Sequence, residues 1–480
     1  MRTRNHFSSV WLMTAASVMC IFVVAFSGCV STNRSVNGKT ALSLWNDDAP
    51  ARNALIDFVE SVTDKSSADF IPEEDRIAVF DFDGTLFCET DPNYFDYTLL
   101  NYRVTEDPEY KNRASAFERE VAQKIRKQNE TGESFTGLEV DHGKAVASSF
   151  KGMTLSEFDA YIQNFKKTPM PSYIGMNRGD GFYAPMLQVV EYLEANGFTV
   201  YVVSGTDRFI VRGIIKDSPL KLSPGQIIGS DETLAADGQG NADGLNYQFT
   251  QKDRLVTGGT FIIKNLKMNK VSVIMKEIGQ QPVLSFGNST GDSSMANFTI
   301  TDNPYRSLAF MLCCDDLERE NGNESKAGKM FDLCNANGWQ SISMKNDWKS
   351  IYGDGVEKTL GYKWTDLLGN WEEKFWDYDF EGKGKICIAK NGSVYSVHIE
   401  RASSAASIEV YDMNATEASG GVLVYENGVH TIRRISDGNS KDEIKSTNGS
   451  GQFYLNSANE IMWDDRLDHA GDGLVFISVE

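Results

Sequence analysis

The chain is 480 residues long, with 41% hydrophobic and 24% charged residues, a composition typical of folded rather than disordered proteins. This length is enough for about three domains. The 67 acidic residues outnumber the 47 basic ones and give a net charge of −20. Such an excess of acid argues against a nucleic-acid binder and against docking on anionic lipid through a basic patch. It leaves room for a small anionic substrate, because one bound metal ion can invert the charge of a site.

The N-terminus has the features of an export signal. Arg2 and Arg4 precede an uncharged apolar run from Val10 to Phe26. The segment Phe26-Ser27-Gly28-Cys29 resembles a bacterial lipobox, although Phe26 stands where leucine is usual. We therefore predict a signal peptide over residues 1–28, a lipid on Cys29, and anchoring to the bacterial cell envelope on its periplasmic or outer side. An uncleaved N-terminal anchor helix is the alternative interpretation.

Five cysteines follow Cys29, an odd number at irregular spacing that indicates neither a disulfide framework nor a zinc site. They are Cys88, Cys313, Cys314, Cys334 and Cys387. We interpret them as small buried hydrophobic residues. A disulfide from Cys334 to Cys313 or Cys314 is the pairing that stays open.

Residues 29–44 are polar and predict a tether. Beyond them, apolar strand-like runs alternate with helical patterns, which indicates an α/β fold with a mostly parallel sheet. The predicted buried strands are Ile77–Phe82, Thr199–Val203, Val283–Phe286 and Ser307–Leu312. The predicted helices are Ala51–Val62, Pro185–Ala195 and Lys270–Ile278.

A mainly helical stretch over residues 89–176 interrupts this alternation, with Ala114–Gln128 and Leu155–Lys166 as its clearest helices. We predict that it forms a cap inserted into a core made of residues 45–88 and 177–353. The segment Ala235–Gly244, rich in Gly, Asp and Ala, predicts an exposed hairpin-like excursion.

Residues 362–480 have a different character and predict an all-β sandwich or barrel. Its strand-like runs include Ser393–Ile399, Gly421–Tyr425 and Leu474–Val479, and its turn signals are Asn391-Gly392, Asn427-Gly428 and Asn448-Gly449. One run is strongly aromatic: Trp371, Phe375, Trp376, Tyr378 and Phe380. These rings are expected to fill the β-core, with stacking platforms for a glycan as the alternative. The partner of this domain is unknown from sequence.

The strongest chemical signal is the segment Asp81-Phe82-Asp83-Gly84-Thr85, which directly follows a predicted buried strand. Ligands of open α/β sheets bind just beyond the carboxyl ends of the strands. Strand alternation sends Asp81 and Asp83 to the same side of the extended chain. Two neighbouring carboxyl groups can divide labour, one as an ionised nucleophile and the other as a proton carrier.

Three later features fit the same site. Ser204 and Gly205 end a second predicted strand, and Lys270 lies at the head of a predicted helix. Asn288 ends a third strand, with Asp292 four residues later. Each feature alone is weak, but together they follow the order of alternating strands and helices.

With these four motifs the chain resembles the haloacid dehalogenase (HAD) superfamily, nearest its phosphoserine-phosphatase-like branch, over about residues 45–352. Flanking phrases support the resemblance, namely Leu44-Trp45-Asn46-Asp47 and Asn346-Asp347-Trp348-Lys349. The resemblance implies a Rossmann-like core with a parallel sheet and a helical C1-type cap. Under this resemblance, the residues that follow the first motif are expected either to line the substrate pocket or to pack the hinge of the cap. They are Phe87, Glu89, Tyr94 and Phe95.

The resemblance also implies roles for the residues. Asp81 is expected to attack phosphorus, and Asp83 to protonate the leaving alcohol and then activate water. The expected phosphate-binding residues are Gly84, Thr85, Ser204, Gly205 and Lys270. The expected Mg²⁺ ligands are Asp81, Asp83, Asn288 and Asp292, where Asp292 could instead orient Lys270 or a metal-bound water. Asn288 stands where many relatives have Asp, which removes one negative charge from the metal site.

The sequence thus predicts an exported Mg²⁺-dependent phosphomonoester hydrolase that acts on a small phosphorylated metabolite in the cell envelope. One alternative is a surface binding lipoprotein whose β-domain binds glycan or protein. Another is a phosphotransferase or mutase, because mutases of this fold share Asp83.

Overall fold

The computed structural model describes residues 38–89, 93–131, 133–170, 172–358, 364, 367–374, 383–418, 422–436, 438–455, 460–466, 470–471 and 474–479. Several predictions lie outside this part of the chain: the signal peptide, the lipidation site Cys29, most of the tether, and the aromatic positions Phe375, Trp376, Tyr378 and Phe380.

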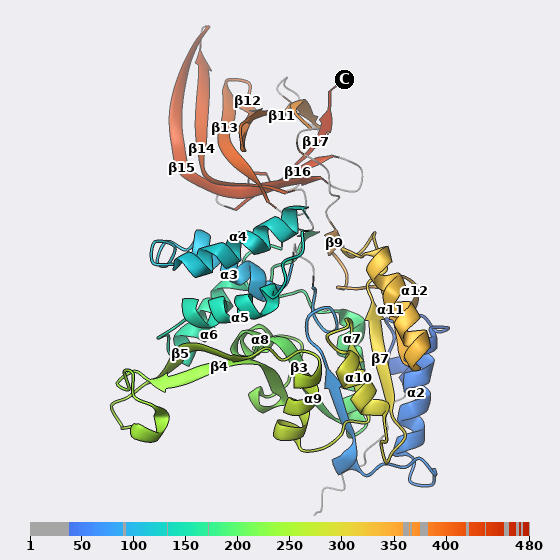
Figure 1. The fold of residues 1–480 in the computed structure, drawn as a ribbon. Helices are drawn as coiled ribbons and strands as arrows, with labels where there is room; N and C mark the ends of the chain where they lie inside the picture. Colours follow the sequence, from blue (N-terminus) through green and yellow to red (C-terminus); the bar gives the residue numbers. More distant parts are fainter. Residues whose placement is uncertain are drawn as a thin grey trace, which may run out of the picture. The chain divides into compact units, whose positions relative to one another are not determined.

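A seven-stranded sheet, with strands between Ile77 and Ser343, forms the centre of the part of the chain that precedes the barrel (Figure 1). Its strands are β1 (Ile77–Phe80), β3 (Thr199–Asp207), β4 (Ile227–Ala236), β5 (Leu255–Ile263), β6 (Leu284–Gly287), β7 (Leu308–Cys313) and β8 (Gln340–Ser343). Their order is β5-β4-β3-β1-β6-β7-β8, and every neighbouring pair is parallel except β4 and β5. The predicted α/β class with a mostly parallel sheet is confirmed.

Helices cover both faces of this sheet, which explains why β1 and β6 are buried at every position. The helices are α1 (Gly38–Ala41), α2 (Pro50–Thr63), α7 (Ala184–Ala195), α8 (Arg208–Ile215), α9 (Met268–Val273), α10 (Ser293–Ile300), α11 (Glu324–Asn337) and α12 (Met344–Asp347). Apolar residues of α2 and α7 share one core cluster with Phe80, Phe286 and Phe310. Residues of α9 and α10 pack on the opposite face, against Val79 and Val203.

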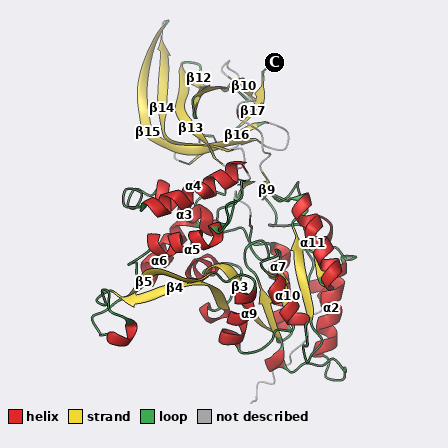
Figure 2. Cartoon of the chain, viewed as in Figure 1, coloured by secondary structure: helices red, strands yellow, loops and turns green. Residues whose placement is uncertain are grey.

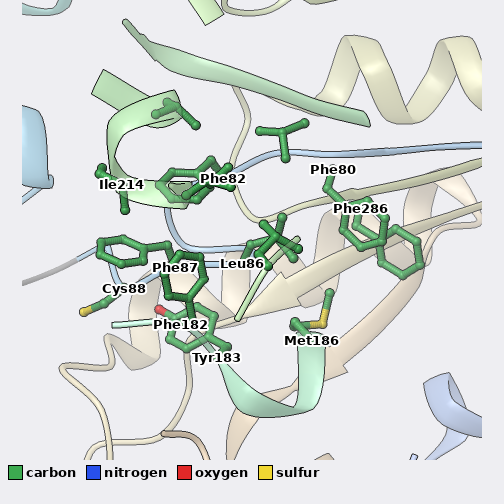
Figure 3. Packing of buried hydrophobic residues seen from close by; sticks show 14 of the residues in the cluster. Phe80, Phe82, Leu86, Phe87, Cys88, Phe182, Tyr183, Met186, Ile214 and Phe286 are labelled. Carbon is green, nitrogen blue, oxygen red and sulfur yellow. The ribbon is translucent and has the colours of Figure 1, made fainter. Parts of the chain in front are cut away.

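Aromatic stacking joins three neighbouring strands of the sheet, β1, β6 and β7. The rings of Phe80 and Phe286 stack with centroids 4.3 Å apart, and those of Phe286 and Phe310 with centroids 4.8 Å apart. Figure 3 shows Phe80 and Phe286 side by side in this core. Phe82, Phe87 and Phe182 form a second group of touching rings behind the turn that follows β1.

The predicted cap region contains four helices, α3 (Phe95–Thr105), α4 (Ala116–Thr131), α5 (Leu138–Ser149) and α6 (Leu155–Phe165). The hairpin of β4 and β5 supports them, since Thr257 Oγ1 donates to the carbonyl of Phe150 at 2.6 Å. The α6 helix begins with a capping box in which Thr154 and Glu157 bond each other's backbone N–H groups. The hairpin predicted around Ala235–Gly244 is the long connection between β4 and β5.

The predicted tether over residues 29–44 is wrong where the structure describes it. Leu42 is fully buried, and the backbone N–H of Leu44 donates to Gln188 on α7 at 2.9 Å. The two flanking phrases of the resemblance pair with each other through Trp45 and Trp348. These apolar side chains pack the start of the described chain against the core. The segment is polar on average, so its composition does not indicate this packing.

A closed barrel of eight antiparallel strands forms the last part of the chain (Figure 2). The strands are β10 (Gly369–Glu373), β11 (Lys385–Asn391), β12 (Val394–Ser404), β13 (Ser407–Ala418), β14 (Val422–Ser436), β15 (Asn439–Leu455), β16 (Ile461–Asp465) and β17 (Val475–Ser478). Pairing of β10 with β17 closes the ring, so the structure decides between the predicted sandwich and barrel. A two-stranded sheet of β2 (Tyr173–Ile174) and β9 (Glu357–Lys358) completes the described strands.

Two of the three predicted turns in this barrel are wrong. Asn391-Gly392 does join β11 to β12, but Asn427-Gly428 lies inside β14, where the register shifts and Asn427 has a φ of 61°. Gly449 lies inside β15, opposite Gly428. Residues that tolerate positive φ serve β-bulges as well as turns, so the same dipeptide predicts both.

The five cysteines after Cys29 are all free thiols, and Cys334 forms no disulfide with Cys313 or Cys314. No helix in the described part of the chain is long and apolar enough to cross a membrane.

Glu232 on β4 is a buried acid whose two carboxylate oxygens have no hydrogen-bond partner among the described residues. Burial, followed by the charges of Asp207 and Asp231, raises the pKa of Glu232 to about 9. A carboxyl group whose pKa is higher in the folded than in the unfolded chain contributes its full stability only below its ordinary pKa. That contribution is lost as the pH rises toward about 9.

We therefore expect Glu232→Gln to raise the melting temperature, and to raise it more at about pH 8 than at about pH 5. Each kcal/mol of relief corresponds to about 2–4 °C in a domain of this size. Differential scanning calorimetry measures the change, with Glu318→Gln at an exposed site as the matched control. An equal change at both pH values would contradict this role of Glu232.

Candidate active site

The predicted motifs meet where the strand order of the sheet reverses, at the carboxyl ends of β1, β3 and β6. The backbone N–H of Asp81 donates to the carbonyl of Phe286 at 2.8 Å, which extends the β1–β6 ladder by one residue. Asp81 and Asn288 therefore leave neighbouring strands at the same level. Asp81, Asp83, Asn288 and Asp292 all line one hollow of about 120 Å³.

Lys270 is the cation of this site. Its Nζ lies 2.6 Å from Asp81 Oδ1 and 2.7 Å from Asp292 Oδ1, and the residue is fully buried. Burial alone would lower the pKa of Lys270, but the charges of Asp292 and Asp81 outweigh it and the pKa is raised. The lysine is thus held as an ammonium ion between two carboxylates.

Asp292 also organises the loop after β6. Its Oδ2 accepts hydrogen bonds from the backbone N–H groups of Asn288 and Ser289, at 3.2 and 3.1 Å, and from the hydroxyl of Ser289. With Lys270 on the other oxygen, both oxygens of Asp292 are already engaged. This geometry suits the orienting role considered for Asp292; its role as a metal ligand stays a prediction.

Asp83 has a different environment from Asp81. Its Oδ2 accepts a hydrogen bond from Thr206 Oγ1 at 2.7 Å, whereas its buried Oδ1 has no partner among the described residues. Burial, then the charges of Asp96 and Asp81, raises the pKa of Asp83 well above its usual range. Burial and Asp292 raise the pKa of Asp81 only to about 7, because Lys270 opposes them. Of the two carboxyl groups, Asp81 is in contact with a cation that favours its ionised form, whereas burial and neighbouring acids favour the protonated form of Asp83.

Gly84 makes the turn between these carboxyl groups and the rest of the motif. Its φ is +75°, and a Cβ at this position would lie 1.9 Å from Asn288 Nδ2. Only glycine combines the left-handed conformation with this close approach. Thr85, the next predicted phosphate-binding residue, is fully buried in the same turn, and its hydroxyl has no partner among the described residues.

The end of β3 brings Gly205 and Thr206 to the hollow, while Ser204 is fully buried beside them. Ser204 Oγ accepts a hydrogen bond from the backbone N–H of Thr206 at 3.0 Å. The amide of Asn265 donates to the carbonyl of Ser204 at 3.0 Å and holds this turn. The predicted contact of Ser204 with a phosphoryl oxygen stays a prediction.

The residues after the first motif divide between pocket and core. Tyr94 lines the hollow, and Glu89 Oε2 accepts a hydrogen bond from Asn288 Nδ2 at 2.9 Å. The rings of Phe87 and Phe95 pack against other buried rings instead.

Sequence reasoning missed several residues of the site. The missed lining residues are Asp96, Tyr97, Glu139, Thr206, Lys264, Leu266 and Ser289. Thr206 had a usable signal, because its hydroxyl follows Ser204-Gly205 directly. The only sequence signal for Asp96 was its position two residues after Tyr94. Nothing in the sequence pointed to Lys264.

The site offers hard oxygen ligands that suit Mg²⁺. These are the carboxylate of Asp81, the backbone carbonyl of Asp83 and the amide oxygen of Asn288, whose nitrogen is already bound to Glu89. Within the described residues, no group of three or more His, Cys, Asp or Glu side chains is arranged to hold a metal ion. A set that mixes carboxylate, amide and backbone oxygens falls outside that pattern, so the residues present fit the implied ion.

Comparison with known proteins assigns this region. Residues 78–297 match the haloacid dehalogenase-like hydrolase family. No curated protein matches the chain.

Three solved structures show a distant likeness. A conserved protein of unknown function from Anaerococcus prevotii is 15% identical, with a TM-score of 0.39 over 65% of this chain and 96% of that one. Cytosolic 5′-nucleotidase IIIB bound to cytidine is 14% identical, with a TM-score of 0.36 over 60% and 84%. A phosphoserine phosphohydrolase-like protein from Francisella tularensis is 14% identical, with a TM-score of 0.31 over 56% and 94%.

The matched region contains every element that carries a motif residue, from Asp81 after β1 to Asp292 after β6. Residues 78–297 of this chain therefore form a haloacid dehalogenase-like hydrolase domain.

Proposed function

We propose that the chain is a Mg²⁺-dependent phosphomonoester hydrolase that works through an aspartyl-phosphate intermediate on Asp81. The observation that supports this most is the unequal environment of Asp81 and Asp83. A hydrolase of this kind needs one ionised carboxylate as nucleophile and one protonated carboxyl as acid. The contact with Lys270 opposes the rise in the pKa of Asp81, whereas the pKa of Asp83 is raised well above its usual range.

In the first proposed step, a carboxylate oxygen of Asp81 attacks phosphorus and the bond to the leaving oxygen breaks. Asp83 gives its proton to that oxygen, so an alcohol leaves. In the second step, Asp83 takes a proton from water as the water oxygen attacks phosphorus, and Asp81 is released as a carboxylate. Lys270 offsets the negative charge that gathers beside Asp81 throughout.

Asp81, the backbone carbonyl of Asp83 and Asn288 would hold the Mg²⁺ ion, which would neutralise charge on the phosphoryl oxygens. Gly84, in the turn after β1, and Gly205, near the end of β3, stay the proposed phosphate-binding glycines, and the space beside their Cα atoms is taken by Asn288 and Leu266. The hollow of about 120 Å³ favours a small phosphorylated metabolite as substrate. Transfer to a sugar acceptor, the phosphotransferase alternative, uses the same residues.

The first test is hydrolysis of aryl and alkyl phosphates by the full chain with Mg²⁺ or with chelator. Asp81→Asn should lower kcat by about 10³-fold or more, because it removes the nucleophile. Asp83→Asn should lower kcat by about 10²–10⁴-fold on glycerol phosphate and by less on p-nitrophenyl phosphate, whose leaving group needs no proton.

Asp302→Asn, at an exposed site with a φ of 49°, is the matched control and should keep full activity. Turnover that survives Asp81→Asn, or that needs no divalent cation, would refute the mechanism. Turnover that appears only with an added sugar acceptor would favour the phosphotransferase.

A second test concerns the amide at position 288. Because Asn288 donates to Glu89 Oε2, an aspartate there would place two carboxylates against each other in the metal-free chain. Loss of a hydrogen bond to a charged group costs about 1.5–3 kcal/mol. Asn288→Asp should therefore lower the melting temperature in chelator, and Glu89→Gln should restore part of it in the double variant.

Thermal unfolding of the parent, both single variants and the double variant measures this coupling. Glu89→Gln also removes the ion pair with Lys326, whose Nζ lies 2.7 Å from Glu89 Oε1. The single variant Glu89→Gln measures the cost of that loss separately. Additive changes in melting temperature would show that Glu89 does not dictate the amide.

We also propose that the enzyme is exported and anchored to the cell envelope by a lipid on Cys29. Cys29→Ser should then move the protein from the membrane fraction to the soluble fraction of the cells that express it. Cys387→Ser, at an exposed barrel position, should leave the distribution unchanged. Membrane association that survives Cys29→Ser would favour the uncleaved anchor helix.

A further inference from the structure

The inner face of the barrel changes from apolar to polar toward one end. Along β12 the inward residues Val397 and Ile399 are followed by Arg401, and Ile399 pairs with Tyr411 of β13. Arg401 pairs with Glu409 in the same register. The polar positions of neighbouring strands therefore gather at one mouth of the barrel rather than being scattered along it.

An ion pair spans this mouth. Arg401 Nε and Nη2 lie 3.0 and 3.2 Å from the two carboxylate oxygens of Glu373, in a forked arrangement across the intervening strand. Glu373 is 3% exposed. Its Oε2 would lie 2.6 Å from a Cβ at Gly384, so the missing side chain there makes room for the carboxylate. The backbone N–H of Gly384 donates to the same oxygen at 3.2 Å.

A second group fixes the carboxylate of Glu409. Its Oε2 accepts a hydrogen bond from Tyr411 at 2.9 Å and lies 2.7 Å from His430 Nε2. The rings of Tyr411 and His430 stack with centroids 4.3 Å apart, and Trp463 meets Tyr411 edge-on. Trp463 is held in turn by a hydrogen bond from its Nε1 to Tyr425 at 3.0 Å. Each polar side chain is oriented before any ligand arrives.

Arg401 and the group of Glu409, Tyr411, His430 and Trp463 line a hollow of about 320 Å³, whereas their partners Glu373 and Tyr425 are not part of its lining. Its lining is Ile399, Arg401, Ala402, Ser403, Glu409, Tyr411, His430, Trp463 and Ala470. Small-molecule sites commonly have about 300–1,000 Å³, and mouths of eight-stranded barrels are frequent places for them. The combination of aromatic walls with a few fixed polar groups is the usual composition of such a site.

The charges of the hollow select the ligand class. Among the described residues, Glu373 is paired with Arg401 and Glu409 with His430, so each basic side chain of the described lining has an acid beside it. The side chains of Arg401 and Glu409 are still 30% and 28% exposed, and a purely apolar ligand would remove the water from these parts without replacing its hydrogen bonds, which is costly. A ring with hydroxyl groups can donate to Glu409, accept from Arg401 and stack its C–H face on the aromatic walls.

We propose that this mouth of the barrel is a binding site for a neutral sugar ring, held between Glu409, Arg401 and the aromatic walls of Tyr411 and Trp463. Tyr411 and Trp463 are not part of the aromatic run from Trp371 to Phe380, which the sequence offers as a glycan platform only in the alternative interpretation. The proposal does not depend on the phosphatase chemistry, because every contact lies within the barrel.

The test is a titration of the full chain with single sugars, followed by Trp fluorescence and by isothermal calorimetry. The neutral probes are glucose, galactose, mannose and N-acetylglucosamine, and the charged ones are glucosamine and glucuronate. At least one neutral sugar should bind with a Kd of about 1 mM or tighter, a typical range for one weakly held ring. Glu409→Gln should weaken that binding by about tenfold or more, since it loses a charged acceptor.

Glu417→Gln on the same strand is the matched control, because Glu417 bonds Tyr395 outside this hollow. It should leave the Kd unchanged. Arg401→Lys keeps the positive charge but loses the forked contact with Glu373, so it should weaken sugar binding. The melting temperature of this variant shows whether it still folds. The proposal is overturned if no neutral sugar binds the parent chain, if binding survives Glu409→Gln, or if only the charged sugars bind.

Discussion

The buried ammonium group of Lys270 is the constraint on which the catalytic end of the sheet depends. It comes from α9, and its two partners come from the turn after β1 and the loop after β6. Breaking a buried ion pair by removing one partner is strongly destabilising, because an uncompensated charge remains in low dielectric. Three segments that lie far apart in the sequence must therefore meet within hydrogen-bond distance. The stacked Phe80 and Phe286 rings hold β1 and β6 in the register that allows it.

The same ion pair separates the roles of two carboxyl groups that are only two residues apart. Asp81 touches Lys270 and Asp83 does not, so burial acts on Asp83 with only Thr206 to oppose it. The nearby Asp96 adds to the rise in the pKa of Asp83. Chemistry that needs a nucleophile and an acid at one pH thus follows from which neighbour each side chain meets, not from the residue type.

The sequence was sufficient to locate the strands whose ends carry chemistry, because a buried strand followed by carboxylates is a local pattern. It could not reveal contacts between side chains that are remote in sequence. Glu89 and Asn288 are 199 residues apart, and no periodicity links them. In their hydrogen bond the amide of Asn288 supplies a donor that an aspartate would lack, at a position where the sequence showed only a departure from the common pattern. Asp96 was missed for the same reason, since it enters the hollow from the first turn of a cap helix.

The barrel shows a second limit of local patterns. Alternation of apolar and polar residues predicts strands, but closure depends on the pairing of β10 with β17, about a hundred residues apart in the chain. Asn427 and Gly428 predict a turn because they tolerate positive φ, yet the long strand β14 uses them as a bulge. Tyr425 and His430 are five positions apart, and in an unbroken strand an odd spacing would place their side chains on opposite faces. The bulge between them lets both lie on the inner face.

The hollow around Asp81 and the hollow around Glu409 hold their carboxylates in different ways, and this difference matches what we propose for each. In the hydrolase domain, Asp83 keeps one buried oxygen without a partner among the described residues, and its pKa is raised, as the proposed role of proton carrier requires. In the barrel, Glu373 accepts from Arg401 and Gly384, and Glu409 from Tyr411 and His430. Carboxylates fixed by several donors present a constant pattern of charge and hydrogen bonds. That arrangement suits recognition of an unreactive ring, whereas the incompletely bonded acid of the hydrolase domain suits a reaction in which a proton has to move.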